Sequence, residues 1–285
     1  MRELIIVRGG GDIATGTIWT LRKAGFSVLI LECAAPSAIR RSVSFCEAVY
    51  AGKAAVEGME CLLAKDLKDA VRLLKEEKLA MLVDPEGRSV KNFKKNGTYA
   101  DEFRYLALVD GILAKKNLGT ERDMAPFVIA LGPGFTAGKD CDAVVETMRG
   151  HNLGRVFTEG SALPNTGMPG LIAGHASDRV LHAEYAGILF NRSKIGDIVE
   201  KDQTIAVIRD EKGTDHEVKA TFEGLLRGLI RDGFPVTKGF KIADIDPRET
   251  EFKNCFTISD KARAIGGSVL MAVMQYRKET ENDLL

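Results

Sequence analysis

Short apolar runs alternate with amphipathic stretches along the first half of the chain. The apolar runs predict buried strands at 4–8, 28–32, 79–83 and 127–131, and the amphipathic stretches predict helices at 12–24, 66–78 and 102–116. In the second of these helices Leu67, Val71 and Leu74 recur at a helical period, and Asp66 can cap the first turn. Residues 45–63 fit one or two strands or loops. Strands separated by helices predict βαβ units and a largely parallel sheet.

A different pattern begins after residue 131. Residues 132–174 are rich in glycine and proline, which predicts ordered loops, and they contain one predicted helix at 140–149. The chain closes with a predicted helix at 261–276, in which Gly266 and Gly267 would form a small-residue contact with another element.

An internal repeat lies between these parts. Residues 187–208 and 224–245 align with an offset of 37 and no gap, and eight of the 22 aligned positions are identical. Such a period marks two similar units that bury a shared core. Each unit has short β-runs around a G-x-x-V-x-K turn, which resembles the barrel-sandwich fold of lipoyl and biotinyl domains. Those domains carry their cofactor on a lysine beside methionine. Lys219 has no such neighbour, so we expect no covalently attached biotin or lipoate.

The sharpest local motif follows the first predicted strand. Gly9, Gly11 and Ala14 fit the pattern G-x-G-x-x-[G/A], in which a tight turn brings a pyrophosphate to the amides at the start of a helix. Glu32 ends the second strand, where an acid would bind a ribose 2′-hydroxyl and disfavour a 2′-phosphate. The motif therefore favours an NAD-like or adenosine-type ligand, with a ligand-free glycine turn as the alternative. Asp12 could repel a phosphate, which counts against the motif.

Two arginines and one missing lysine refine this prediction. Arg40 and Arg41 follow the second strand and could receive a phosphate, which weakens the inference from Glu32. A Walker A loop is excluded, because Thr17 follows Gly16 where that motif needs a lysine.

A second glycine-rich loop is expected at the same edge of the sheet. It follows the strand at 127–131 and precedes the helix predicted at 140–149, so it could receive another anion. Asp84 ends a neighbouring strand. In a parallel sheet these positions share the carboxyl edge, where open α/β sheets bind ligands. The predicted ligand-binding set is Gly9, Gly10, Gly11, Asp12, Ile13, Ala14, Glu32, Arg40, Arg41, Asp84, Gly132, Gly134 and Gly138.

Acidic residues in the helix predicted at 140–149 offer a weaker alternative, a metal site. Asp142 and Glu146 are spaced i,i+4 and would share a helix face, with Asp140 and His151 nearby. Acids near a helix start also stabilise it by ~0.3–1 kcal/mol without a metal, so we expect no metal. Cys141 fits an inert buried thiol better than a nucleophile. The polar turn at 159–170 fits a functional loop or a surface connection equally well.

Composition narrows the function classes. The 40 basic and 40 acidic side chains give no net charge, which opposes a general nucleic-acid binder and a strongly charged membrane-surface protein. Five scattered cysteines without a C-x-x-C pair predict reduced thiols in a cytoplasmic protein. We expect no membrane association, since no apolar run approaches the ~20 residues of a span and the first residues do not resemble a signal peptide.

Longer strings resemble a known family. VRGGGDIATG (7–16), RRSVSFCEAVYAG (40–52), ALGPGFTAGKDCDAVVETMRGHNLGR (130–155) and PNTGMPG (164–170) resemble the YqeB-type family, over essentially the whole chain. That family is associated with the selenium-dependent molybdenum hydroxylase system, and its members are regarded as maturation or accessory factors. The first domain is also similar to the Rossmann domain of XdhC-like proteins, which handle molybdenum cofactor. The resemblance implies a nucleotide or molybdopterin-dinucleotide ligand and a molybdenum hydroxylase as protein partner, and it supplies no catalytic residue.

The expected architecture is an α/β protein with two domains. A Rossmann-like parallel-sheet domain spans 1–182, including the glycine-rich extension at 132–174. A barrel-sandwich β-module follows at 183–247, and a helical segment at 248–285 returns to the first domain.

The expected function is an accessory or maturation factor that binds a dinucleotide- or pterin-type ligand. Whether it catalyses a reaction or forms a homo-oligomer is open at this point. One alternative is an NAD-dependent oxidoreductase in which Cys141 or His151 does chemistry, and another is a ligand-free scaffold for hydroxylase assembly.

Overall fold

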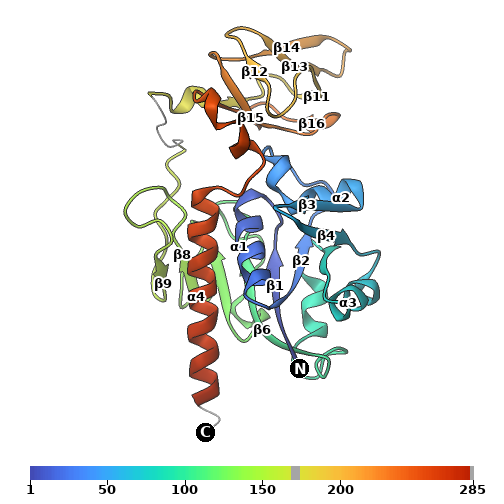
Figure 1. The fold of residues 1–285 in the computed structure, drawn as a ribbon, viewed down its shortest axis with the longest axis vertical. Coiled ribbons are helices and arrows are strands. Elements are labelled where there is room, and N and C mark those ends of the chain that lie inside the picture. Colours follow the sequence, from blue (N-terminus) through green and yellow to red (C-terminus); the bar gives the residue numbers. More distant parts are fainter. Residues whose placement is uncertain (168–173, 283–285) are drawn as a thin grey trace. The chain divides into compact units, whose positions relative to one another are not determined.

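The chain folds into two compact units in the computed structural model, which describes residues 1–167 and 174–282 (Figure 1). The first unit comprises Met1–Pro36, Ser44–Asn165 and the chain from Ile258 onward. The second comprises Ser37–Val43 and Thr166–Thr257. Each unit is therefore assembled from segments that are distant in the sequence.

A nine-stranded sheet forms the centre of the first unit. Its seven inner strands are parallel, and the strand at each edge runs antiparallel to its neighbour. In spatial order the strands are β3 (Lys53–Val56), β4 (Met59–Leu63), β5 (Leu79–Val83), β2 (Ser27–Glu32), β1 (Arg2–Arg8), β6 (Phe103–Asp110), β7 (Val128–Leu131), β8 (Ala143–Val145) and β9 (Val156–Phe157). The chain moves from β1 to β2 on one side and later to β6 on the other, so the sheet has a topological switch point beside β1.

Two long helices pack against each other in this unit. Figure 1 shows α1 (Asp12–Lys23) and α4 (Asp260–Asn282) side by side. A Cβ on Gly16 would lie 2.6 Å from Ala262 O, and one on Gly266 would lie 2.7 Å from Gly16 O. The predicted small-residue contact is therefore confirmed at Gly266, whereas Gly267 faces open space.

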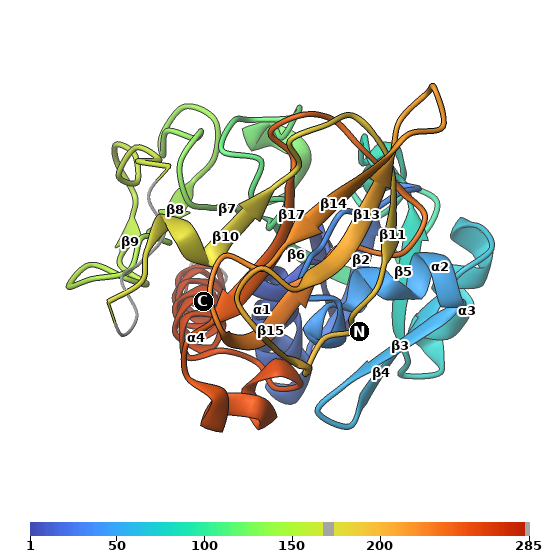
Figure 2. The same cartoon turned by 90° about the horizontal axis from the view of Figure 1, so that it is seen from above.

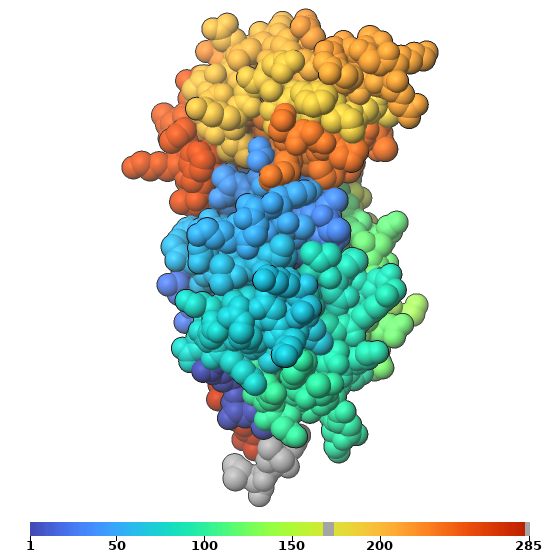
Figure 3. Space-filling view, turned by 90° about the vertical axis from the view of Figure 1, so that its right-hand side faces the viewer, coloured from blue at the N-terminus to red at the C-terminus, as the bar shows by residue number. Residues whose placement is uncertain are grey.

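The remaining helices are shorter. α3 (Leu67–Lys75) begins after Asp66, which caps it as predicted by accepting a hydrogen bond from Asp69 N at 2.8 Å. Its buried apolar side chains share one core cluster with the Leu4 and Ile6 side chains of β1. The segment from β3 to α3 forms part of the blue-to-cyan surface in Figure 3. The other short elements are α2 (Ala48–Ala51), η1 (Arg41–Val43), η2 (Phe45–Glu47), η3 (Arg88–Asn92), η4 (Arg122–Met124), η5 (Ser177–Arg179) and η6 (Glu249–Cys255). None of the described helices is long and apolar enough to cross a membrane.

The prediction of a helix at 102–116 is wrong, because residues 103–110 of this segment form strand β6. Leu106, Ala107, Leu108 and Val109 are all buried, since β6 lies between β1 and β7 in the middle of the sheet. A strand covered on both faces is a continuous apolar run. Periodicity cannot distinguish such a run from a buried helical segment.

The helix predicted at 140–149 is also wrong. Ala143, Val144 and Val145 form β8, which pairs in parallel with β7, and all three residues are 0% exposed. β-branched side chains favour such a buried strand. Three residues are too few for an alternating or helical period to become visible in the sequence.

Two small antiparallel sheets make up the second unit, and Figure 2 shows several of their strands running side by side. The order in one sheet is β10 (Val180–His182), β17 (Lys241–Asp246), β15 (Gly224–Leu229) and β12 (Ile198–Val199). The order in the other is β14 (Asp215–Lys219), β13 (Thr204–Arg209), β11 (Gly187–Asn191) and β16 (Phe234–Val236).

The predicted internal repeat is confirmed by these pairings. Strands β11, β12 and β13 of the first repeat correspond to β15, β16 and β17 of the second. β11 pairs with β16 and β12 pairs with β15, so each repeat contributes one short strand to the sheet of the other. The identical apolar positions lie in one shared core: Leu189, Leu226, Val199, Val236, Ile205, Ile242, Ala206, Ala243, Ile208 and Ile245. The exchange of strands places the matching residues of the two repeats in one core.

Matching glycines begin the two repeats for the same steric reason. A Cβ on Gly187 would lie 2.2 Å from Arg209 O, and one on Gly224 would lie 2.7 Å from Asp246 O. Arg209 and Asp246 are themselves equivalent at the offset of 37. Only glycine allows this close approach between the first and last strands of each repeat.

Candidate functional site

The predicted glycine motif lies in the loop between β1 and α1, at the carboxyl edge of the large sheet. Gly9 has a φ of 90°, and a Cβ there would lie 3.0 Å from the backbone of Gly111 and Ile112, which follow β6. A Cβ on Gly10 would lie 2.9 Å from Met81 Cε. These two glycines let neighbouring segments pack closely, which is a structural need independent of any ligand.

Gly11 differs from both. Its φ of −66° and ψ of 179° are open to any residue, and a Cβ there would meet nothing within 4 Å. It precedes the first residue of α1, and its N–H has no acceptor within the part of the chain that the structure describes. Ile13 N, in contrast, donates to Asp12 Oδ1 at 2.9 Å, and Ala14 is buried. Gly11 therefore presents an amide donor beside open space, at the positive end of the helix dipole.

Glu32 ends β2, as predicted, and its carboxylate binds the glycine loop. Oε2 accepts a hydrogen bond from Gly10 N at 2.7 Å, and Oε1 accepts one from Cys33 N at 2.8 Å. The acid thus stabilises the loop itself. Each oxygen keeps a second lone pair, which a hydroxyl donor can use.

Two thiols lie near this carboxylate. Burial and the Glu32 charge raise the pKa of Cys33 to about 11. Burial, Glu32 and further acids raise the pKa of Cys46 well above its usual value. Both thiols are therefore protonated at neutral pH, and a protonated thiol is a poor nucleophile.

A buried ionic network, which was not predicted, lies at the carboxyl ends of β1 and β6. Arg8 is 1% exposed, and its Nη1 donates to Thr120 Oγ1. Its Nη2 donates to Pro85 O at 2.7 Å and to Leu118 O at 3.1 Å. Thr120 Oγ1 in turn donates to Asp110 Oδ2 at 2.5 Å, which lies 3.8 Å from Arg8 Nη1. The network ties three segments together at the topological switch point.

Its acidic member is strongly desolvated. Burial raises the pKa of Asp110, although hydrogen bonds from Thr120 and Ile112 N and the charge of Arg8 oppose the shift. Arg8 Nε is buried and has no partner among the described residues. The sequence signal for this network is an arginine that ends an apolar strand directly before three glycines.

Asp84 lies at the same edge, just after β5. Its carboxylate accepts hydrogen bonds from Arg88 N at 3.0 Å, from Ser89 N at 2.7 Å and from Ser89 Oγ at 2.6 Å. These contacts hold the start of η3, so Asp84 has a structural role in the turn.

The second glycine-rich loop packs against its own surroundings. A Cβ on Gly132 would lie 2.5 Å from Thr147 Oγ1, and one on Gly134 would lie 2.6 Å from Lys116 Cα. Gly138 faces open space. The loop leads into strand β8 and not into a helix. The prediction that it opens a helix whose start could receive an anion is therefore wrong.

The four metal candidates do not converge. Asp142 and Glu146 flank a strand, so the premise that they share a helix face is wrong. Asp140 accepts a hydrogen bond from Thr136 N, Asp142 from Val128 N and Arg122 Nε, and Glu146 from Met148 N and Leu163 N. His151 is exposed. Among residues 1–167 and 174–282, no group of three or more His, Cys, Asp or Glu side chains could hold a metal ion.

Three further candidates are Cys141, Lys219 and the polar turn at 159–170. Burial raises the pKa of Cys141 to about 12, which keeps its thiol protonated. Lys219 ends β14 and lies 3.3 Å from Glu217 Oε2. Residues 168–170 of the polar turn at 159–170 lie outside the described residues.

Arg40 and Arg41 lie in the second unit. Arg40 is buried, and its Nη2 donates to Asn254 O at 2.9 Å. Arg41 Nε donates to Leu229 O at 2.8 Å, and Leu229 N donates to Ile39 O at 2.8 Å. These bonds anchor the segment 37–43 within the second unit.

Comparison with known proteins gives one clear relative. The chain is 48% identical over 272 residues to the uncharacterized protein YqeB of Escherichia coli (strain K12), and the match covers 95% of this chain. It covers 47% of YqeB, so the chain spans about half the length of this relative. No family model matches the chain.

Solved structures resemble the chain only distantly. An aspartoacylase family protein from Mesorhizobium loti is 12% identical with a TM-score of 0.29, and the match covers 87% of this chain and 86% of that chain. A succinylglutamate desuccinylase/aspartoacylase from Rhodobacter sphaeroides is 15% identical with a TM-score of 0.28, with the same coverage of 87% and 86%. Scores this low carry no argument about fold or activity.

Proposed function

Starting from the homology of this chain to YqeB, we propose that it is an accessory or maturation factor of a selenium-dependent molybdenum hydroxylase system. In this role it binds a nucleotide or molybdopterin-dinucleotide-type ligand at the loop between β1 and α1. The order β5-β2-β1-β6-β7-β8 supports a Rossmann-like sheet, because it matches the order 3-2-1-4-5-6 of that fold. Ligands of such sheets bind at the switch point beside the first strand.

The open amide of Gly11 is the observation that carries the proposal. A pyrophosphate needs close approach to backbone N–H groups at a helix start, and side chains block that approach. Gly9 and Gly10 are explained by packing, but nothing in the fold requires glycine at residue 11. A ligand that approaches this backbone supplies the missing reason.

Two acidic groups restrict where the ribose and the pyrophosphate of the ligand can lie. Glu32 retains lone pairs for ribose hydroxyls while it holds Gly10 N. Asp12 lies beside the loop and opposes a phosphate placed near its carboxylate. The proposed ligand therefore places a ribose at Glu32 and its pyrophosphate at Gly11, as in NAD or a pterin dinucleotide.

We propose that the second unit is a barrel-sandwich module that docks a partner or a second copy. Its paired repeats and exchanged strands resemble the two-fold construction of lipoyl and biotinyl domains. A molybdenum hydroxylase is the proposed protein partner, through the family resemblance.

An NAD-dependent oxidoreductase is the less favoured candidate. Its chemistry would need Cys141 or His151. The pKa of Cys141 is raised to about 12, and His151 is exposed, with no hydrogen-bonded acid to orient it among the described residues. Scaffold assembly without a ligand leaves Gly11 unexplained.

Isothermal titration calorimetry on the wild-type chain and the Gly11→Val variant tests the proposal. We expect saturable binding of molybdopterin cytosine dinucleotide to the wild type and its loss in the variant, with similar far-UV circular dichroism. Gly267→Val is the matched control, because a side chain at that position also meets open space but lies on α4. Binding of NAD with no binding of the pterin dinucleotide favours the oxidoreductase over the maturation factor, and full binding by Gly11→Val contradicts the proposed site.

A further inference from the structure

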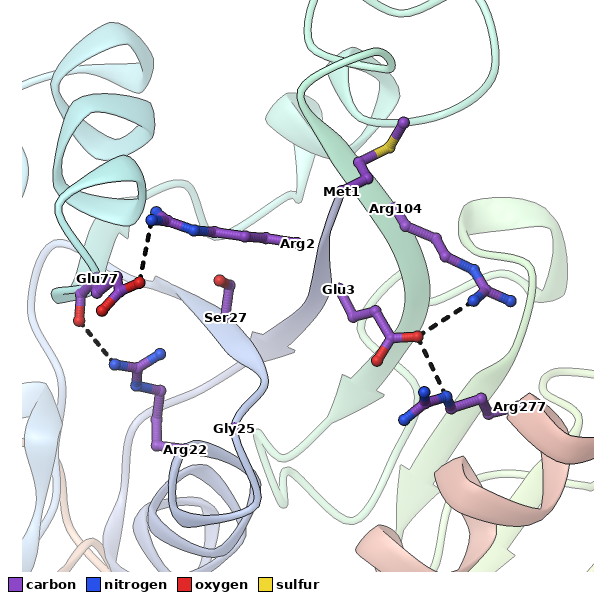
Figure 4. A pocket seen from close by; sticks show the side chains of 9 residues that line it. All are labelled: Met1, Arg2, Glu3, Arg22, Gly25, Ser27, Glu77, Arg104 and Arg277. Atoms are coloured by element: carbon purple, nitrogen blue, oxygen red, sulfur yellow. Dashed lines mark hydrogen bonds and ion pairs between the residues drawn. The ribbon is translucent and has the colours of Figure 1, made fainter.

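A cavity of about 690 Å³ opens at the amino edge of the large sheet (Figure 4). It is lined by four arginines from four different elements or their ends: Arg2 of β1, Arg22 of α1, Arg104 of β6 and Arg277 of α4. Glu3 and Glu77 are the acids in its lining, so the lining side chains carry a net charge of +2. Its volume lies in the range of small-molecule sites, but its charged lining suits a polar ligand.

Two of the arginines brace the wall of the cavity. Arg2 Nη1 donates to Leu74 O at 3.0 Å, and Arg22 Nη2 donates to Glu77 O at 2.7 Å. Arg2 Nη2 also pairs with Glu77 Oε1 at 3.0 Å. These carbonyls belong to the end of α3 and the turn after it, where cations are favourable. The two guanidinium groups are therefore fixed, and both are attached to the same turn.

The other two arginines keep free donors. Arg104 Nη1 and Arg277 Nε both pair with Glu3 Oε1, at 3.2 and 3.3 Å, and both also lie near Glu281. Arg104 Nε and Nη2 and Arg277 Nη1 and Nη2 have no partner in the described part of the chain. Figure 4 shows both guanidinium groups directed at the same oxygen of the Glu3 carboxylate. Their side chains are each 36% exposed, so these donors are open to a ligand.

We propose that this cavity binds a small polyanion that carries two or more phosphate or carboxylate groups. Guanidinium groups bind such oxyanions in a bidentate way. One anionic group accepts hydrogen bonds from the free donors of Arg104 and Arg277, and a second anionic group balances the charge beside Arg2 and Arg22.

This site is separate from the glycine loop. Glu3 lies near the start of β1 and Gly9 follows its end, which places them roughly 20 Å apart at ~3.3 Å per residue. Binding here therefore does not depend on the function proposed for Gly11.

The test is calorimetry at constant ionic strength with pyrophosphate, tripolyphosphate and citrate as probes. The double variant Arg104→Gln/Arg277→Gln removes both donor groups and keeps polar side chains. Arg72→Gln is the matched control, because Arg72 also pairs with two carboxylates, Asp69 and Glu76, but lies outside the cavity. Thermal denaturation of each variant checks that it folds.

We expect saturable binding to the wild type, at least about tenfold weaker binding to the double variant and unchanged binding to Arg72→Gln. Comparison of pyrophosphate with citrate identifies a phosphate or carboxylate ligand, and either supports the site if it depends on the arginines. Equal binding by the double variant, or no saturable binding of any probe, overturns the proposal. Loss of binding in Gly11→Val alone assigns the anion to the glycine loop and overturns it as well.

Discussion

The two edges of the large sheet hold their arginines in opposite ways. At the carboxyl edge Arg8 is 1% exposed, and its guanidinium donates to two separate segments, at Pro85 and at Leu118 and Thr120. At the amino edge Arg104 and Arg277 are each 36% exposed and share acids that leave other donors free. The first edge is a fixed frame with an opening at Gly11, whereas the second is a charged surface that can adapt. Binding by backbone amides needs the first arrangement, and binding by side-chain charges tolerates the second.

The largest expected effect is on the carboxyl edge. Replacing Arg8 by methionine leaves Asp110 buried without its cation, which we expect to lower the free energy of unfolding by about 3–5 kcal/mol. Urea unfolding followed by circular dichroism measures the loss. A companion variant that also carries Asp110→Asn should recover part of it, because no charge then remains unpaired. A loss below about 1 kcal/mol in Arg8→Met alone would show that the network is not what fixes this edge.

The pH dependence of the same variant has a definite sign. The pKa of Asp110 is raised in the folded state, so its protonated form favours folding at acidic pH and that contribution is lost as pH rises through the folded pKa. Removing Arg8 raises this pKa further. The loss of unfolding free energy in Arg8→Met should therefore be greatest at neutral pH and shrink as the solution is acidified. Urea unfolding curves of the variant and the wild type, recorded at neutral and at acidic pH, measure this change. A deficit that grows with acidity contradicts this account.

A smaller effect separates the two neighbouring glycines of the frame. Gly10→Ala places a Cβ 2.9 Å from Met81 Cε and 3.1 Å from Cys46 N, and we expect a loss of about 1–3 kcal/mol. In Gly11→Ala the new Cβ contacts no atom, and only the preference for glycine over alanine at the helix cap is lost. We expect this to lower the free energy of unfolding by about 0.5–1 kcal/mol. Chemical denaturation of both variants compares them directly. Equal losses would remove the distinction between a packing glycine and an open one.

The smallest effect belongs to the amino edge. Arg104→Gln and Arg277→Gln, made singly, should each change the free energy of unfolding by less than about 1 kcal/mol, because exposed ion pairs contribute little. Unfolding at low and high salt checks this, and any difference from wild type should shrink as salt increases. A loss comparable to that of Arg8→Met would make these arginines part of the frame.

Local pattern predicted the elements whose period was visible. The strand ending at Arg8, the helix after Gly11 and the cap at Asp66 all follow from short stretches of sequence. The sequence predicts helices in place of β6 and β8, because residues 106–109 of β6 form a continuous apolar run and β8 has only three residues. Their identity depends on the strands beside them, which lie far away in the sequence.

The two edges differ in the same respect. Glu32 and the glycine motif lie about 20 residues apart, at a known spacing, so their proximity was predictable. The spacing does not predict that the Glu32 carboxylate accepts a hydrogen bond from Gly10 N and so stabilises the loop itself. Arg22, Arg104 and Arg277 come from three distant segments that carry no shared motif, and only the folded sheet brings them together.

The glycine contact between α1 and α4 has a consequence for synthesis on the ribosome. Gly16 and Gly266 are about 250 positions apart, so the surface of α1 that receives α4 waits while the intervening chain is translated. At roughly 5–20 residues per second this interval lasts on the order of 10–50 s. The nascent chain thus carries an unpaired helix surface until α4 has been synthesised, and a chaperone has that interval in which to act.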